Sequence, residues 1–174
     1  SGRAYPAVLH IHGGPQAQWD FGFNSEAQLL AAQGYVVVMP NPRGSFGYGQ
    51  EFASSITGNW GGPDFTDVMA AIDYGIDKGW IDSEQMAVYG WSYGGILTNH
   101  AITKTNRFDA AITGASATLY VANYGHDQYQ RWWEEELGFP WLLENKDAWD
   151  SISPFYALDK VNTPTLVVGG EEDR

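Results

Sequence analysis

Ser92 has the sequence surroundings of a catalytic nucleophile. It lies in Gly90-Trp91-Ser92-Tyr93-Gly94, which matches the pattern G-x-S-x-G. An apolar run precedes this pattern and a helix-forming segment follows it, so the serine falls at a turn between a strand and a helix. A sharp turn exposes the hydroxyl, and the flanking glycines remove Cβ clashes. The alternative is that the pattern marks only a glycine-rich loop, so its surroundings must decide.

Acyl transfer by a serine also needs amide donors for an oxyanion and a histidine oriented by a carboxylate. The backbone amide of Tyr93 directly follows the serine, and an amide of Gly13 or Gly14 could supply the second donor of an oxyanion hole. Asp173 is the candidate carboxylate, because it follows an apolar run near the end of the chain. The alternative for Asp173 is a solvated acidic terminus.

The elements that must position these residues alternate along the chain. Apolar runs predict buried strands at 7–11, 35–39, 86–89, 110–115 and 164–168, and helices are predicted at 25–32, 64–78 and 93–104. This order indicates an α/β fold with a mostly parallel sheet and helices on both faces. Loops at the carboxyl ends of parallel strands open on one edge, which would bring Gly13, Ser92 and Asp173 together.

Three local patterns refine this outline. The continuous β-branched run at 35–39 predicts a strand in the interior of the sheet. The sequence Ser25-Glu26-Ala27-Gln28 predicts a capping box at the start of a helix. The aromatic-rich segment at about 118–158 predicts a helical excursion over the sheet, within one partial catalytic domain that covers residues 1–174.

Composition excludes several classes of partner. The chain of 174 residues has 9 Lys and Arg against 21 Asp and Glu, a net charge of −12, and its basic residues are scattered. Nucleic acid and anionic membrane surfaces are therefore not expected partners, and no apolar run approaches the length of a membrane-spanning helix. Since the chain has no cysteine, the compartment stays open, with the cytoplasm as the preferred expectation.

Four motifs in order, HGGP, NPRGSFGYG, GWSYGG and PTLVVGGEEDR, make the sequence similar to the catalytic domain of the prolyl oligopeptidase family of serine peptidases. Its acylaminoacyl peptidase and dipeptidyl peptidase branches are the most similar. The resemblance implies an α/β-hydrolase fold, Ser92 as nucleophile, Asp173 as triad acid and cleavage of short peptides without a cofactor. The family's N-terminal propeller has no counterpart in this sequence.

The resemblance also implies roles for residues around the serine. It places a hydrophobic substrate pocket near Tyr93, formed by Leu119, Tyr120 and Tyr124, with His12 of the HGGP loop beside it. Arg43 is similar to a loop arginine of the family, and we expect a structural ion pair there rather than a substrate contact. We expect no metal site, because no histidine is paired with a carboxylate at ligand spacing.

The histidines depart from the family pattern. The family places its catalytic histidine a few dozen residues after the aspartate, whereas this sequence ends one residue after Asp173. We therefore expect a C-terminally truncated chain, with a fold incomplete at both ends and an exposed sheet edge through which it could self-associate. We expect His10, His12 and His100 to be structural, and His126 is the one histidine with freedom to approach the serine.

These observations favour a serine-type peptidase domain that hydrolyses short peptides through an acyl-enzyme. One alternative is an esterase of the same fold, which would use the same two glycine loops on an ester. Another is an inactive fragment that lacks the catalytic histidine.

Overall fold

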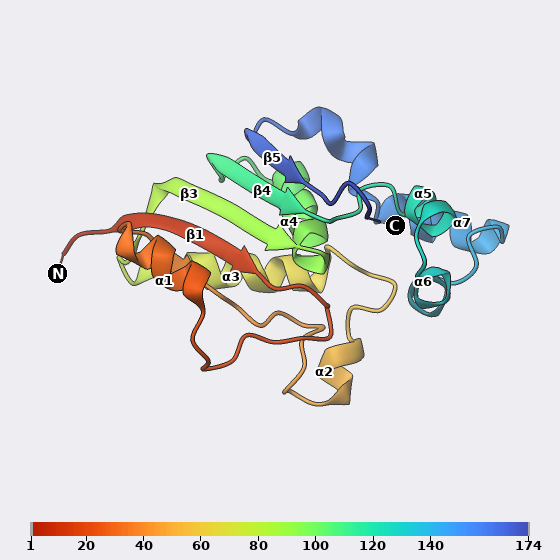
Figure 1. Ribbon diagram of the computed structural model, residues 1–174, viewed down its shortest axis with the longest axis horizontal. Helices are drawn as coiled ribbons and strands as arrows, with labels where there is room; N and C mark the ends of the chain where they lie inside the picture. The colour runs from red at the N-terminus through yellow and green to blue at the C-terminus, as the bar shows by residue number, and fades with distance from the viewer. Residues whose placement is uncertain (1, 174) are drawn as a thin grey trace.

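A parallel sheet forms the centre of the computed structural model, which describes residues 2–173 (Figure 1). Ser1 and Arg174, the two ends of the predicted domain, lie outside the described residues. The strand order is β2-β1-β3-β4-β5, and every neighbouring pair is parallel. The strands are β1 (Tyr5–Ile11), β2 (Val36–Val38), β3 (Ile81–Trp91), β4 (Ala110–Gly114) and β5 (Thr165–Val168). The predicted α/β class and its parallel sheet are confirmed.

The helices cover both faces and the carboxyl edge of the sheet. They are α1 (Ser25–Ala32), α2 (Gln50–Ser54), α3 (Pro63–Asp77), α4 (Tyr93–Lys104), α5 (Tyr120–His126), α6 (Gln130–Leu137), α7 (Leu143–Ser151) and the 3-10 helix η1 (Pro154–Lys160). Helices α3 and α4 pack on one face and α1 on the other, while α5, α6 and α7 lie beyond the arrowheads of the strands (Figure 1). Of the helices within residues 2–173, none is both long and apolar enough to cross a bilayer.

The main core lies between the sheet and the pair α3 and α4. Alternate residues of a strand point to opposite faces, and Leu9 of β1 and Val88 of β3 both point into this core and are fully buried. They meet Ile72 of α3 and Leu97 of α4, which are also fully buried. The helix predicted at 64–78 therefore packs its apolar side against this face of the sheet.

Two local predictions were wrong. Strand β2 lies at one edge of the sheet rather than in its interior, and Val36, Val37 and Val38 are only half-buried. A β-branched run indicates that a segment forms a strand. The position of that strand within the sheet depends instead on where the connecting segments return the chain to the sheet. The N-cap of α1 is Asn24, whose side chain accepts from the amide of Ala27 at 2.8 Å, so Ser25 is the first helical residue and not the cap.

The segment from 118 to 160 folds as helices α5, α6 and α7 at the carboxyl edge of the sheet, followed by η1, which leads back to the start of β5 (Figure 1). Its interior is aromatic: Trp60, from the loop before α3, lies 5.5 Å from the ring of Tyr120 and 5.4 Å from that of Trp133. Trp133 continues the stack to Trp149 at 5.8 Å. All four of these rings are buried, so the aromatics of this segment build its core.

Candidate active site

Ser92 lies at the tip of a tight turn between β3 and α4. Its φ of 57° and ψ of −123° are strained for a residue with a Cβ. The Ser92 amide donates to the carbonyl of Gly114 at 2.9 Å, and the Ser92 carbonyl accepts from the amide of Ile96 at 3.0 Å. A Cβ on Gly90 would overlap the backbone of Gly94, so this turn requires glycine there. The side chain of Ser92 is consequently held out in solvent.

The loop that follows β1 lies directly against the serine. A Cβ on Gly13 would lie 3.1 Å from the carbonyl oxygen of Trp91 and 3.4 Å from the Cβ of Ser92. His12 points away from this contact into the protein, where Nε2 lies 2.9 Å from Oγ of Ser45 and Nδ1 lies 2.7 Å from the carbonyl oxygen of Gly13. Burial lowers the pKa of His12, while the contact with the Gly13 carbonyl opposes this shift.

A cavity of about 370 Å³ opens beside Ser92, and Asp173 lies on its wall. The structure thus brings together Ser92, Tyr93, Gly14 and Asp173, four of the residues singled out from the sequence. The rest of the wall comes from the residues after β4, from α5 and α6, and from β5: Ile96, Ala115, Ser116, Ala117, Asn123, His126, Asp127, Tyr129, Trp132, Trp133, Val167, Val168 and Gly169.

The four residues expected to form the substrate pocket do not line this cavity: His12, Leu119, Tyr120 and Tyr124. Tyr120 is fully buried, and its hydroxyl contacts Nε2 of His100 at 2.9 Å. Tyr124 donates to Glu134 at 2.8 Å and packs its ring edge-on against Trp149 at 5.7 Å. These contacts place Tyr120 in the core of the helical segment and the half-buried Tyr124 against that core.

The wall includes His126, the histidine expected to be free to approach the serine, together with Asn123 and Asp127, which sequence reasoning missed; all three lie on or directly after α5. Their spacing of three and four residues puts them on one side of a helical turn. That spacing was the available signal, but the start and direction of α5 could not be read from an aromatic-rich stretch. Asp127 is oriented in turn by Trp133, whose indole Nε1 donates to the Asp127 carboxylate at 2.8 Å.

The histidines divide into buried and cavity-lining groups. His100 is 3% exposed, and burial, together with the smaller effect of the Lys104 charge, lowers its pKa to about 3. His10 is 4% exposed in β1 and stacks on Tyr89 at 4.6 Å. Among the histidines of residues 2–173, only His126 lines the cavity, and no hydrogen bond within that range joins it to Ser92 or Asp173.

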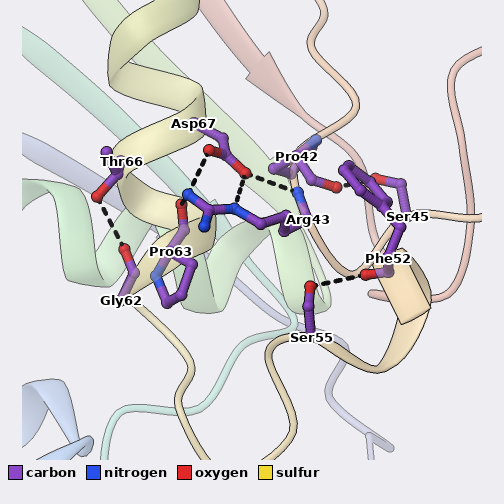
Figure 2. Close-up of polar contacts among 9 residues, drawn as sticks. All are labelled: Pro42, Arg43, Ser45, Phe52, Ser55, Gly62, Pro63, Thr66 and Asp67. Atoms are coloured by element: carbon purple, nitrogen blue, oxygen red, sulfur yellow. Dashed lines mark hydrogen bonds and ion pairs between the residues drawn. The ribbon is translucent and has the colours of Figure 1, made fainter. Parts of the chain in front are cut away.

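Arg43 forms the structural ion pair expected of it. Figure 2 shows its guanidinium pointing at Asp67 of α3, with Nε 2.8 Å from Oδ2 and Nη2 2.7 Å from Oδ1. Nη2 also donates to the carbonyl of Pro63 at 3.1 Å. Because a two-point contact of this kind fixes orientation as well as distance, Arg43 ties loop 41–49 to the first turns of α3. The hydrogen bonds with Asp67 raise the pKa of Arg43.

The sequence pattern of the prolyl oligopeptidase family matches residues 19–174. A Bacillus subtilis protein named "Uncharacterized peptidase YuxL" is 40% identical over 171 residues, which cover 97% of this chain and 26% of that protein. Acylamino-acid-releasing enzyme 1 of rice (Oryza sativa subsp. japonica) is 32% identical over 184 residues, covering 97% of this chain and 23% of that enzyme.

Solved structures agree with these sequence matches. The acylaminoacyl peptidase of Pyrococcus horikoshii aligns with a TM-score of 0.89 at 31% identity, over 97% of this chain and 28% of that one. A puromycin-hydrolyzing peptidase of Mycobacterium tuberculosis aligns with a TM-score of 0.89 at 28% identity, over 98% of this chain and 26% of that one.

The chain spans about a quarter of the length of the curated relatives it matches. Within that span the matched pattern covers most of its residues, and the parallel sheet superimposes on the solved peptidases. The chain therefore belongs to the prolyl oligopeptidase family, a family of serine peptidases, and has the α/β-hydrolase fold of its catalytic domains.

Proposed function

We propose that Ser92 is the nucleophile of a peptidase that hydrolyses short peptides through an acyl-enzyme. The observation that carries this proposal is the strained, solvent-exposed position of Ser92 at a cavity whose wall also holds Asp173. A serine in an ordinary loop would adopt a relaxed conformation, and strain of this kind gathers at reactive sites. Membership of a peptidase family supports the choice of an amide bond as substrate.

The proposed reaction starts with attack of Ser92 Oγ on the peptide carbonyl, as its proton passes to a histidine base. The amide of Tyr93 and an amide of Gly13 or Gly14 then donate to the oxyanion. Asp173 holds the histidine in the tautomer that accepts the proton. Collapse of the tetrahedral intermediate releases the amine, and water hydrolyses the ester formed on Ser92.

We do not assign the base to His126. Its ring lines the cavity without a hydrogen bond to Ser92 or Asp173, whereas a general base must reach the proton that it accepts. We assign His126, together with Asn123 and Tyr129, to the wall that contacts the substrate. The relatives are about four times longer than this chain. The size of the substrate and the identity of the base are therefore properties of the whole protein.

A fluorophosphonate probe tests the nucleophile directly, because it forms a covalent bond with an activated serine. Intact-mass analysis of the whole protein should find one adduct, mapped to Ser92, and none on its Ser92→Ala variant. Equal labelling of both proteins would contradict the proposal. An unlabelled but folded wild-type chain would support the alternative of an inactive fragment.

A pair of matched substrates distinguishes the esterase alternative from a peptidase. A short peptidyl p-nitroanilide and the matching p-nitrophenyl ester present the same acyl group with different leaving groups. Cleavage of both by the wild type, and of neither by Ser92→Ala, is the expected result for a peptidase. Ester cleavage alone would favour the esterase.

A further inference from the structure

The side chain of Tyr93 is anchored to a buried carboxylate. Its hydroxyl donates to Oδ2 of Asp64, and the amide of Gly61 donates to the same oxygen at 3.0 Å. Asp64 is 0% exposed and Tyr93 is 2% exposed. A carboxylate is costly to bury without strong partners, so these two donors account for much of what keeps Asp64 in place.

This anchor joins two helices at their first turns. Asp64 is the second residue of α3, and Tyr93 is the first residue of α4, directly after the strained Ser92. The Tyr93 peptide cannot turn freely while its ring is held, because the indole of Trp60 packs edge-on against that ring at 5.7 Å. The backbone amide assigned to the oxyanion hole and the anchored hydroxyl thus belong to one restrained residue.

Several groups around Asp64 favour its charged form and partly offset the effect of burial. Lys104 of α4 donates to the carbonyl of Gly61, the residue whose amide binds Asp64, and its ammonium attracts the carboxylate. The amides of Asp64 and Phe65, in the first turn of α3, also lower the pKa of the carboxyl group. Burial raises the pKa of Asp64, whereas the hydrogen bond from Tyr93 is the largest of the effects that lower it. Burial and Asp64 together raise the pKa of Tyr93 well above its usual value, so the tyrosine remains the donor.

We propose that Asp64 is a positioning residue for the nucleophile turn: by binding the Tyr93 hydroxyl, it sets the direction of the Tyr93 amide and the strained conformation of Ser92. Asp64 touches neither substrate nor the reacting atoms. The effect on the reaction rate of Ser92 rests on the proposed function. The effect on the conformation of the turn can be measured independently of that function.

Tyr93→Phe is the mild test, because it keeps the ring and removes only the anchored hydroxyl. The rate of Ser92 phosphonylation should fall roughly 10- to 100-fold, since a small misplacement of an oxyanion donor is costly. Asp64→Ala should give a similar loss, and the double variant should be no slower than Asp64→Ala alone. Asp64→Asn, which keeps an acceptor oxygen for Tyr93, should recover most of the rate. With a peptide substrate, the loss should fall on kcat rather than on KM.

Thr103→Val is the matched control. It removes another buried hydroxyl from α4, one that donates only to backbone carbonyls at 2.9 and 3.0 Å. Its phosphonylation rate should stay near that of the wild type. If Ser92 of the wild type reacts and Tyr93→Phe reacts as fast as Thr103→Val, the positioning role is overturned. The proposed function would remain intact.

Amide hydrogen exchange provides the readout that does not depend on activity. The amide of Ser92 donates to the Gly114 carbonyl of β4, and the amide of Ile96 donates to the Ser92 carbonyl. Exchange of both amides should accelerate at least tenfold in Tyr93→Phe but not in Thr103→Val. Unchanged exchange at both amides would overturn the inference, whether or not Ser92 reacts with the probe.

Discussion

Asp64 and Asp67 lie one turn apart at the start of α3, and each holds a different loop of the site. Asp64 binds the hydroxyl of Tyr93, next to the nucleophile, whereas Asp67 binds the guanidinium of Arg43 in loop 41–49. Both carboxylates belong to one rigid element, so a single helix end fixes the nucleophile turn relative to that loop. Five predictions test how residues in and around this site affect stability and the reaction of Ser92.

The first prediction concerns the bond between Arg43 and Asp67. Arg43→Lys should lower the melting temperature by roughly 2–6 °C, because an ammonium cannot reproduce the two-point contact or the bond to Pro63. Thermal unfolding followed by circular dichroism measures this change. Arg107→Lys is the control, since Arg107 makes one surface contact with Asp73 at 2.6 Å. A larger effect for Arg107→Lys than for Arg43→Lys would contradict the prediction.

The second prediction concerns the close contact of Gly13 with the nucleophile turn. Gly13→Ala places a Cβ 3.1 Å from the Trp91 carbonyl and 3.4 Å from the Cβ of Ser92. The rate of phosphonylation should fall roughly 10- to 100-fold, because the loop must shift away from the serine. Gly125→Ala is the control, as a Cβ there meets no atom within 4 Å. Equal rates for the two variants would show that the contact has no catalytic consequence.

The third prediction uses the pKa of His100, which burial lowers from 6.5 to about 3. Between these values the unfolded chain binds a proton that the folded chain does not. The stabilising contribution of neutral His100 is therefore complete above pH 6.5 and is lost as the pH falls below it, by about 1.4 kcal/mol per pH unit at most. Chemical denaturation from pH 7 to pH 5 measures this slope.

His100→Gln is the comparison for that slope. Glutamine does not titrate, and it can still bond the Tyr120 hydroxyl that His100 contacts at 2.9 Å. The free energy of unfolding of His100→Gln should vary less with pH between 7 and 5 than that of the wild type. Parallel pH profiles would mean that other groups, such as the carboxylates, account for the whole slope.

The fourth prediction separates a wall residue from a base. If His126 only contacts the substrate, His126→Gln should raise KM and leave the phosphonylation rate of Ser92 within about threefold of the wild type. Loss of a general base costs about 10²–10⁴-fold, so a loss of that size would identify His126 as the base and contradict its assignment to the cavity wall.

The fifth prediction concerns Asp173, which lines the cavity together with Ser92. Asp173→Asn keeps the size of the side chain but would favour the wrong histidine tautomer. In an active protein it should lower kcat by about 10⁴-fold with little change in melting temperature. Asp159→Asn is the control, because Asp159 lies in η1, which contributes no residue to the cavity wall. Wild-type kcat in Asp173→Asn would exclude Asp173 from the triad.

Much of this molecule could be predicted from short stretches of sequence. The alternation of apolar runs with helical stripes was enough for the parallel α/β fold, because each element depends on residues that are neighbours in the chain. The turn at Ser92 was predictable for the same reason: the glycines that permit it flank the serine directly. Four ordered motifs then indicated the family, which the comparisons confirm.

The tertiary structure decided what depends on residues far apart in the chain. Neither the edge position of β2 nor the partner of Arg43 follows from local patterns, because both depend on where a crossover returns the chain to the sheet. The same holds for the cavity wall, where α5 presents His126 while Tyr120 enters the core and the half-buried Tyr124 packs against it. The bond between Tyr93 and Asp64 is the clearest case, since no sequence spacing relates two helix ends that meet only when α3 and α4 pack against the same sheet face.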